Sequence, residues 1–158
     1  EITILIVKSS VLYQHRNCVR VSRQIYWLLF AVLALTNVES NQISELQSII
    51  VNKSPDCSAK AGSQDYVSYH YVGTFYENGD KFDSSYDRGQ PYRFTIDRGE
   101  VIEGMNEGIK GMCVGERRVI TIPSAMAYGE RGYSPVIPPD SDLVFQVEML
   151  EILKKSDL

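Results

Sequence analysis

The sequence has few of the side chains on which metal binding and covalent catalysis depend. Its 158 residues include three cysteines and two histidines, no Cys-x-x-Cys pair occurs, and His15 and His70 stand alone. A zinc site needs several such ligands at short, regular spacings. The sequence therefore predicts no metal site and no cofactor.

An excess of positive charge is also lacking. The chain carries 16 Lys and Arg against 20 Asp and Glu, a formal net charge of -4, and its basic residues are interspersed with acidic ones in the C-terminal two thirds. Such a surface repels phosphate backbones. We therefore expect no nucleic-acid partner, and the length is that of one folded core with a terminal appendage.

No apolar run is long enough to cross a bilayer as a helix. Residues 25–35 are apolar, follow three arginines and precede a polar stretch that contains the small Ser40. This run has about 11 residues, against the roughly 20 that a membrane-spanning helix needs. The order is typical of a secretory signal; an uncleaved anchor and a core helix are the alternatives. We expect residues 1–40 to be a signal region that is incomplete or extended at its start and is removed, with membrane contact only there, and residues 41–158 to form a single domain.

The three cysteines fit a secreted protein only if one is discounted. Cys18 lies upstream of the apolar run and would be lost with the signal, which leaves Cys57 and Cys113 as an even pair. An oxidising compartment would allow this pair to form a disulfide. Two free buried thiols are the alternative.

Alternation of apolar and polar residues predicts several antiparallel strands. The expected strands, with an Asn78-Gly79 hairpin turn after the second, are residues 45–52, 65–75, 91–96, 117–122 and 142–153. Between 101 and 112, apolar residues recur at helical spacing, although three glycines there each weaken a helix by roughly 1 kcal/mol. The pattern predicts an α+β fold, an antiparallel β half-barrel wrapped around one short packed helix, with the loop 123–141 over one end.

A proline-stiffened loop supplies the strongest sign of function. Val136-Ile137-Pro138-Pro139 follows the Tyr128-Gly129 turn and precedes the apolar-alternating residues 143–148. Apolar side chains on a rigid loop beside an aromatic-rich strand favour a preformed apolar pocket. Five short motifs occur in a characteristic order: Tyr71-Val72-Gly73, residues 79–85, residues 101–104, Ala127-Tyr128-Gly129 and Ile137-Pro138-Pro139. Together they resemble the FKBP (FK506-binding protein) family of peptidyl-prolyl cis-trans isomerases, over almost all of residues 46–153.

The resemblance implies a prolyl isomerase with a specific set of pocket residues. The residues assigned to catalysis are Tyr71, Asp83, Tyr128 and Phe145. Those assigned to substrate and ligand binding are Phe82, Tyr92, Val101, Ile102, Met105, Tyr133, Val136 and Ile137. In this assignment Asp83 and Tyr128 are the polar groups of the pocket, and the backbone N–H of Ile102 holds a ligand carbonyl. The alternative is that Phe82 and Phe145 are ordinary residues of the hydrophobic core and that Asp83 is a turn residue.

Two positions depart from the family's pattern. Met105 stands where the family usually has a tryptophan at the pocket floor, and Tyr133 where a histidine is frequent. Methionine is flexible and has no flat indole face. The expected partners are proline-containing polypeptides and macrolides such as FK506 and rapamycin, the latter with reduced affinity. A weakly catalytic or non-catalytic binding module, acting as chaperone or adaptor, is the alternative function.

The signal and the cysteine pair point to a compartment. In these two features the chain resembles the small endoplasmic-reticulum member of the family, which also has a signal and has cysteines that match Cys57 and Cys113. The resemblance implies a protein of the endoplasmic-reticulum lumen, or a secreted one, that assists protein folding.

Overall fold

A computed structural model describes residues 43–157, so the expected signal region, Cys18 and Leu158 lie outside the described residues. The strands within this range are β1 (Gln47–Asn52), β2 (Tyr66–Phe75), β3 (Lys81–Ser84), β4 (Tyr92–Thr95), β5 (Arg117–Ile122) and β6 (Leu143–Leu153). The helices are α2 (Glu103–Ile109) and the short 3-10 turns η1 (Ser124–Met126), η2 (Gly129–Arg131) and η3 (Lys155–Asp157). None of these described helices has the length and apolar character to span a membrane.

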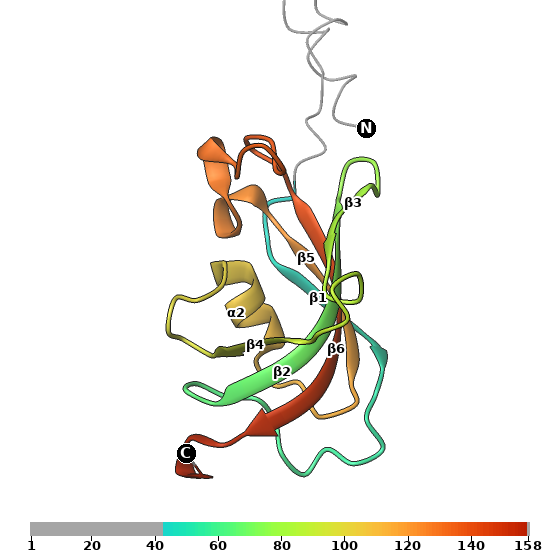
Figure 1. The fold of residues 1–158 in the computed structure, drawn as a ribbon, viewed down its shortest axis with the longest axis vertical. Coiled ribbons are helices and arrows are strands. Elements are labelled where there is room, and N and C mark those ends of the chain that lie inside the picture. The colour runs from blue at the N-terminus through green and yellow to red at the C-terminus, as the bar shows by residue number, and fades with distance from the viewer. Residues whose placement is uncertain (1–42, 158) are drawn as a thin grey trace, which may run out of the picture. The chain divides into compact units, whose positions relative to one another are not determined.

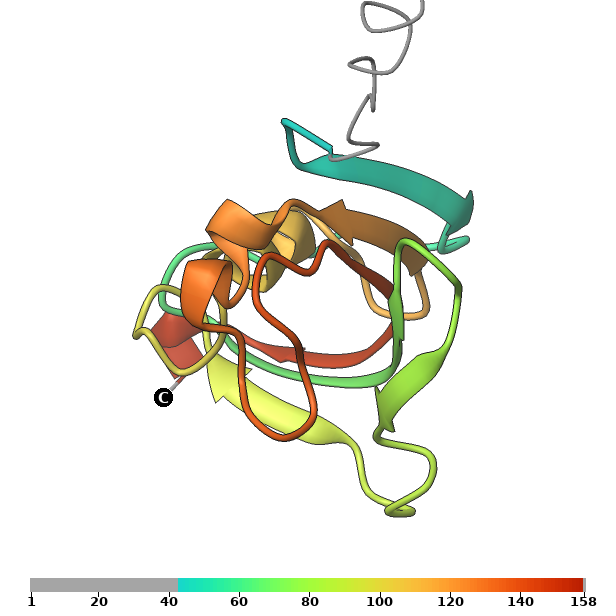
Figure 2. The ribbon, with the colours of Figure 1, turned by 90° about the horizontal axis from the view of Figure 1, so that it is seen from above.

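The strands form one antiparallel sheet in the order β1-β5-β6-β2-β3, with β4 also paired to β2. Its two long central strands, β2 and β6, pair from Tyr66 with Leu153 to Phe75 with Leu143. Figure 1 shows these strands side by side with α2 against one face of the sheet. In Figure 2 the sheet curls, and the orange segment between β5 and β6 crosses one end of it. The α+β half-barrel predicted from the sequence is confirmed.

Two glycines let α2 lie close to the sheet. A Cβ atom at Gly108 would lie 2.5 Å from Cγ2 of Ile120, and one at Gly104 would overlap Ile122. Both isoleucines are fully buried on β5, so they have little room to move aside. The glycines that weaken the isolated helix therefore permit the packing that stabilises it.

A buried ion pair joins the end of α2 to β5. Arg118 pairs with Glu116 at 2.6 Å and also donates to the carbonyl oxygens of Gly108, at 2.8 Å, and Lys110, at 3.1 Å. A cation at this end satisfies carbonyls that have no partner within the helix and opposes the negative end of its dipole. Glu116 in turn accepts the N–H of Cys113 at 3.1 Å.

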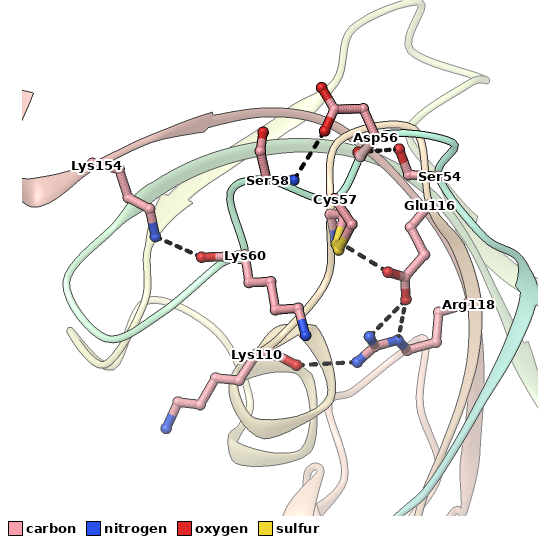
Figure 3. Close-up of a disulfide and its surroundings, with 10 residues drawn as sticks. Ser54, Asp56, Cys57, Ser58, Lys60, Lys110, Glu116, Arg118 and Lys154 are labelled. Atoms are coloured by element: carbon pink, nitrogen blue, oxygen red, sulfur yellow. Dashed lines mark hydrogen bonds and ion pairs between the residues drawn. A yellow bond between two sulfur atoms is a disulfide. The ribbon is translucent and has the colours of Figure 1, made fainter.

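The predicted disulfide is confirmed. Cys57 and Cys113 are bonded, with Cα atoms 5.2 Å apart, inside the usual range for a disulfide. Figure 3 shows Cys57 beside the Glu116–Arg118 pair. The bond therefore fastens the segment before β2 to the turn that follows α2.

The described strands differ from the predicted ranges mainly at the sheet edges. The opening strand was expected from residue 45, but β1 begins at Gln47 and its apolar residues are exposed, Ile49 by 61% and Val51 by 66%. This apolar run pairs only with β5 and does not enter the core. β3, the second arm of the Asn78-Gly79 hairpin, has four residues, too few for alternation to define its bounds.

Candidate functional site

Four of the predicted pocket residues meet as an aromatic cluster on the inner face of the sheet. Tyr71 of β2 has its ring 5.8 Å from Phe145 of β6, and 6.2 Å from Tyr92 of β4 in an edge-on contact. Phe82 of β3 lies edge-on to Phe145 at 5.7 Å. Edge-to-face pairs at these separations are favourable beyond the area they bury. Four strands thus contribute to one wall of rings.

Gly73 makes room for this wall. It pairs with Phe145 and Asp83 on the neighbouring strands. A Cβ atom here would lie 2.6 Å from Cζ of Phe82 and 3.2 Å from the Phe145 ring. The absence of a side chain at Gly73 therefore permits the Phe82 ring to lie where it does. In the sequence, Gly73 stands out only as part of the Tyr71-Val72-Gly73 motif.

A polar network lies at the edge of the cluster. The Tyr71 hydroxyl donates to Oδ2 of Asp83, and Arg88 donates to Oδ1 of Asp83. The other arm of the Arg88 guanidinium donates to the Tyr71 hydroxyl at 2.8 Å, and the group lies 5.6 Å from the centre of the Tyr71 ring. Arg88 was not predicted as a site residue. The available signal was a cation five positions after Asp83, but such spacing has no fixed meaning in a turn.

The network fixes the protonation of both acidic groups. Burial alone would raise the pKa of Asp83, but hydrogen bonds from Tyr71 and Arg88 outweigh it and lower this pKa. Burial, and then the hydrogen bond to Asp83, raise the pKa of Tyr71 to about 12. At neutral pH Asp83 is therefore a carboxylate and Tyr71 a neutral phenol. Neither group is poised to transfer a proton.

The other predicted residues come from the helix start and the long loop. Val101, Ile102 and Tyr128 pack against the buried core that contains Tyr71 and Phe145. Burial raises the pKa of Tyr128, and electrostatic interactions with Tyr133, Asp83 and Tyr92 raise it further. The Tyr128 and Tyr133 rings are 5.7 Å apart.

These residues differ greatly in exposure. Met105 and Ile137 are buried, whereas Tyr133 and Val136 are exposed. Tyr133 and Ile137 exchange backbone hydrogen bonds at 2.8 Å, so the loop closes on itself as a rigid turn. Tyr133 and Val136 therefore lie at the protein surface, whereas Met105 and Ile137 lie in the core.

A backbone donor remains available beside the rings. The carbonyl of Ile102 accepts the N–H groups of Met105 and Asn106, both at 3.1 Å, as α2 begins. Among residues 43–157 no hydrogen bond uses the N–H of Ile102 as donor. This donor therefore has no protein partner in the part of the chain that the structure describes.

A surface hollow of about 450 Å³ lies elsewhere, beside the β2–β3 hairpin. It is lined by residues 75–78 and 138–142 and includes none of the predicted pocket residues. In the part of the chain that the structure describes, no group of three or more His, Cys, Asp or Glu side chains is arranged to hold a metal ion. The candidate site is therefore the aromatic cluster with its polar network, a combination suited to binding an apolar group next to a carbonyl.

Known proteins share this architecture. Residues 57–150 match the family FKBP-type peptidyl-prolyl cis-trans isomerase. The chain is 46% identical over 123 residues to peptidyl-prolyl cis-trans isomerase FPR2 of Saccharomyces cerevisiae, covering 77% of this chain and 91% of that protein. It is 45% identical over 130 residues to FK506-binding protein 2 of Dictyostelium discoideum, covering 81% and 97%. The crystal structure of AtFKBP13 superposes with a TM-score of 0.62 at 37% identity, covering 70% of this chain and 94% of that one.

The fold and these similarities thus define a prolyl isomerase. The chain belongs to the FKBP-type peptidyl-prolyl cis-trans isomerase family. The family resemblance inferred from the motifs is confirmed.

Proposed function

We propose that this isomerase acts on X-Pro bonds of polypeptides folding in the secretory pathway, and that the aromatic cluster is its active site. The main support is the Tyr71–Asp83–Arg88 network at the edge of a wall of rings. It places fixed polar groups beside an apolar surface suited to a proline ring.

Rotation about an X-Pro bond is slow because resonance gives the C–N bond double-bond character, with a barrier of roughly 18–20 kcal/mol. Resonance also places negative charge on the carbonyl oxygen, which water stabilises. Removing this water among Tyr71, Phe82 and Phe145 favours the less polarised, twisted amide. Each 1.4 kcal/mol or so removed from the barrier speeds rotation about tenfold. The reaction needs no nucleophile.

The polar groups orient the substrate in this proposal. The free N–H of Ile102 donates to a substrate carbonyl, the Tyr128 hydroxyl binds a second carbonyl, and Asp83 holds the Tyr71 ring in place. Val101, Tyr92, Met105 and Ile137 line the pocket, and Tyr133 and Val136 form its rim.

The proposed compartment is the endoplasmic-reticulum lumen or the secretory route beyond it. The support is the Cys57–Cys113 disulfide, because such bonds persist in oxidising compartments and are rare in the cytosol. Proline-containing polypeptides are the proposed substrates.

A second function, macrolide or proline binding with weak turnover, is favoured by one observation. Met105 is buried beside the aromatic cluster at the position where the resemblance implies tryptophan. A less matched pocket floor reduces affinity for FK506 and rapamycin and slows turnover.

A protease-free assay of cis-to-trans rate on an X-Pro peptide tests the assignment. Phe82→Ala and Tyr128→Ala should each reduce the rate at least about tenfold, a loss of roughly 1.4 kcal/mol of transition-state stabilisation. Leu150→Ala, an exposed apolar residue of β6, is the matched control and should retain the parent rate.

The parent rate should also be flat from about pH 6 to about pH 9, because the low pKa of Asp83 and the pKa of about 12 of Tyr71 leave both charges unchanged there. If Phe82→Ala and Tyr128→Ala both keep the parent rate, and thermal melts show that both are folded, the active site is not the aromatic cluster.

A further inference from the structure

Arg88, which completes the polar network, comes from an exposed turn. Its guanidinium side chain is 48% exposed, and the turn of residues 85–90 between β3 and β4 contains two backbone hydrogen bonds, Gly89 to Tyr86 at 3.0 Å and Gln90 to Ser85 at 3.3 Å. Asp87 of the same turn pairs with Lys81, but both side chains are exposed and such pairs contribute little. The turn therefore needs a stronger anchor if Arg88 is to stay on Asp83.

The base of the turn is anchored at Ser85, which is completely buried. Its Oγ accepts the backbone N–H of Tyr71 at 2.9 Å and lies 2.9 Å from Nδ1 of His70. Its own N–H donates to the Tyr71 carbonyl at 3.1 Å. These bonds fix the first residue of the turn to β2, but they do not reach Arg88.

Tyr86 anchors the turn from the outer face of the sheet. Its ring stacks on His70 with centroids 4.3 Å apart and planes 17° apart, and its hydroxyl donates to Oε2 of Glu148 on β6 at 3.0 Å. Glu148 also pairs with Arg117 of β5 at 3.1 Å. A hydrogen bond from Arg117 is the main reason that the pKa of Glu148 is lowered, so this acceptor stays charged at neutral pH.

Tyr86 and Arg88 are two residues apart on one turn, and their side chains are held on different partners. Tyr86 binds His70 and Glu148, whereas Arg88 binds Tyr71 and Asp83. His70 and Tyr71 are neighbours on β2, where successive side chains point to opposite faces of the sheet. The turn thus folds over the edge of β2 and is held on both faces.

We propose that Tyr86, stacked on His70 and bound to Glu148, is a positioning residue for the isomerase site that acts through Arg88. The inference rests on the proposed function, because it takes Asp83 and Tyr71 as groups of the active site. With Tyr86 held, the turn keeps Arg88 on Asp83 and Tyr71, and the Tyr71 ring keeps its place in the aromatic wall. Without it, Arg88 leaves the network for part of the time.

A double-mutant cycle tests the proposal in the full-length folded protein. Tyr86→Ala should lower kcat/KM on an X-Pro peptide about three- to tenfold, toward the lower end of the effects seen for coupled residues. Tyr86→Phe keeps the ring stack and should lose less than about twofold. In an Arg88→Ala background, Tyr86→Ala should change the rate by less than about twofold, since the residue through which it acts is gone.

Tyr76→Ala is the control, because Tyr76 is also an exposed tyrosine but lies at the β2–β3 hairpin. It should keep the parent rate, and thermal melts should confirm that every variant is folded. Equal losses from Tyr86→Ala with and without Arg88 would show a general structural role and overturn the proposal, as would no loss at all. The Phe82→Ala rate judges the active site separately, so a normal Tyr86→Ala with an impaired Phe82→Ala would refute the positioning role alone.

Discussion

Met105 is the residue at which this chain differs most from the expected pocket. It lies in the first turn of α2, is 3% exposed, and belongs to the same buried cluster as Tyr71 and Phe145. A methionine has more rotamers to restrict than an indole and presents less matched surface to a proline ring. In the proposed pocket this floor would be looser, and the aromatic wall and the polar network would then be the main sources of binding.

Met105→Trp should therefore strengthen the site. We expect isomerase rate and macrolide affinity each to rise by on the order of 1–2 kcal/mol, about five- to thirtyfold, because the indole adds rigid apolar contact. The larger ring must fit beneath Tyr71 and Phe145, and overpacking would cost roughly 1–3 kcal/mol of stability. A thermal melt must therefore accompany the peptide assay and a titration with FK506. A variant as stable as the parent that neither binds nor turns over better would show that Met105 is not the floor.

Site residues could be predicted from the sequence where the family resemblance assigned them a role. They were missed where only the folded geometry gives them one. The family resemblance identified Tyr71, Phe82 and Phe145, and Phe145 does meet the rings of the other two. Arg88 was missed because its contact with Asp83 depends on how the turn 85–90 folds, which spacing along the chain does not encode.

At the scale of elements, α2 shows how packing can outweigh helix propensity. Of the three glycines between residues 101 and 112, Gly104 and Gly108 lie inside α2 and weaken the isolated helix, yet they are the points at which it meets Ile122 and Ile120 of β5. A seven-residue helix would be marginal in water without such packing. Contact with the sheet, more than propensity, therefore stabilises α2.

Gly108→Ala should destabilise the protein for this reason. Alanine favours a helix by roughly 1 kcal/mol over glycine, but the added Cβ would lie 2.5 Å from Cγ2 of the fully buried Ile120. Overpacking of roughly 1–3 kcal/mol outweighs the gain, so the free energy of unfolding in a urea titration should fall. Glu107→Ala, at an exposed position of the same helix, should stay within about 0.5 kcal/mol of the parent. Greater stability in Gly108→Ala would mean that β5 can move away from the helix.

The bounds of a strand were predicted best where the strand contributes side chains to the core. β5 matches its predicted range, and β2 and β6 start within one residue of theirs, because each has buried apolar residues along much of its length. β1 was read from a continuous apolar run, which does not show which face is covered, and its side chains prove to be exposed. The sequence could not show that this run lies at the sheet edge.

At the scale of the whole molecule, the Cys57–Cys113 disulfide joins residues 56 positions apart and closes a loop that includes β2, β3, β4 and α2. Those elements carry Tyr71, Phe82, Tyr92 and Met105, so the bond restricts the unfolded chain over much of the predicted pocket. It does not touch the aromatic cluster itself, since Cys113 lies beside Glu116 at the far end of α2. The bond should therefore contribute to stability and not to the chemistry of the site.

The double variant Cys57→Ala with Cys113→Ala separates these two effects. In the chain-entropy model a loop of this length is worth about 4 kcal/mol, so the free energy of unfolding in urea should fall by up to this amount. The isomerase rate per folded molecule should stay unchanged, because the rings and the Tyr71–Asp83–Arg88 network come from other contacts. Reduction of the parent should lower its stability to that of the variant, whereas reductant should not affect the variant. A rate that falls in the stably folded variant would instead mean that the disulfide holds α2, and with it Ile102 and Met105, in the geometry that the pocket requires.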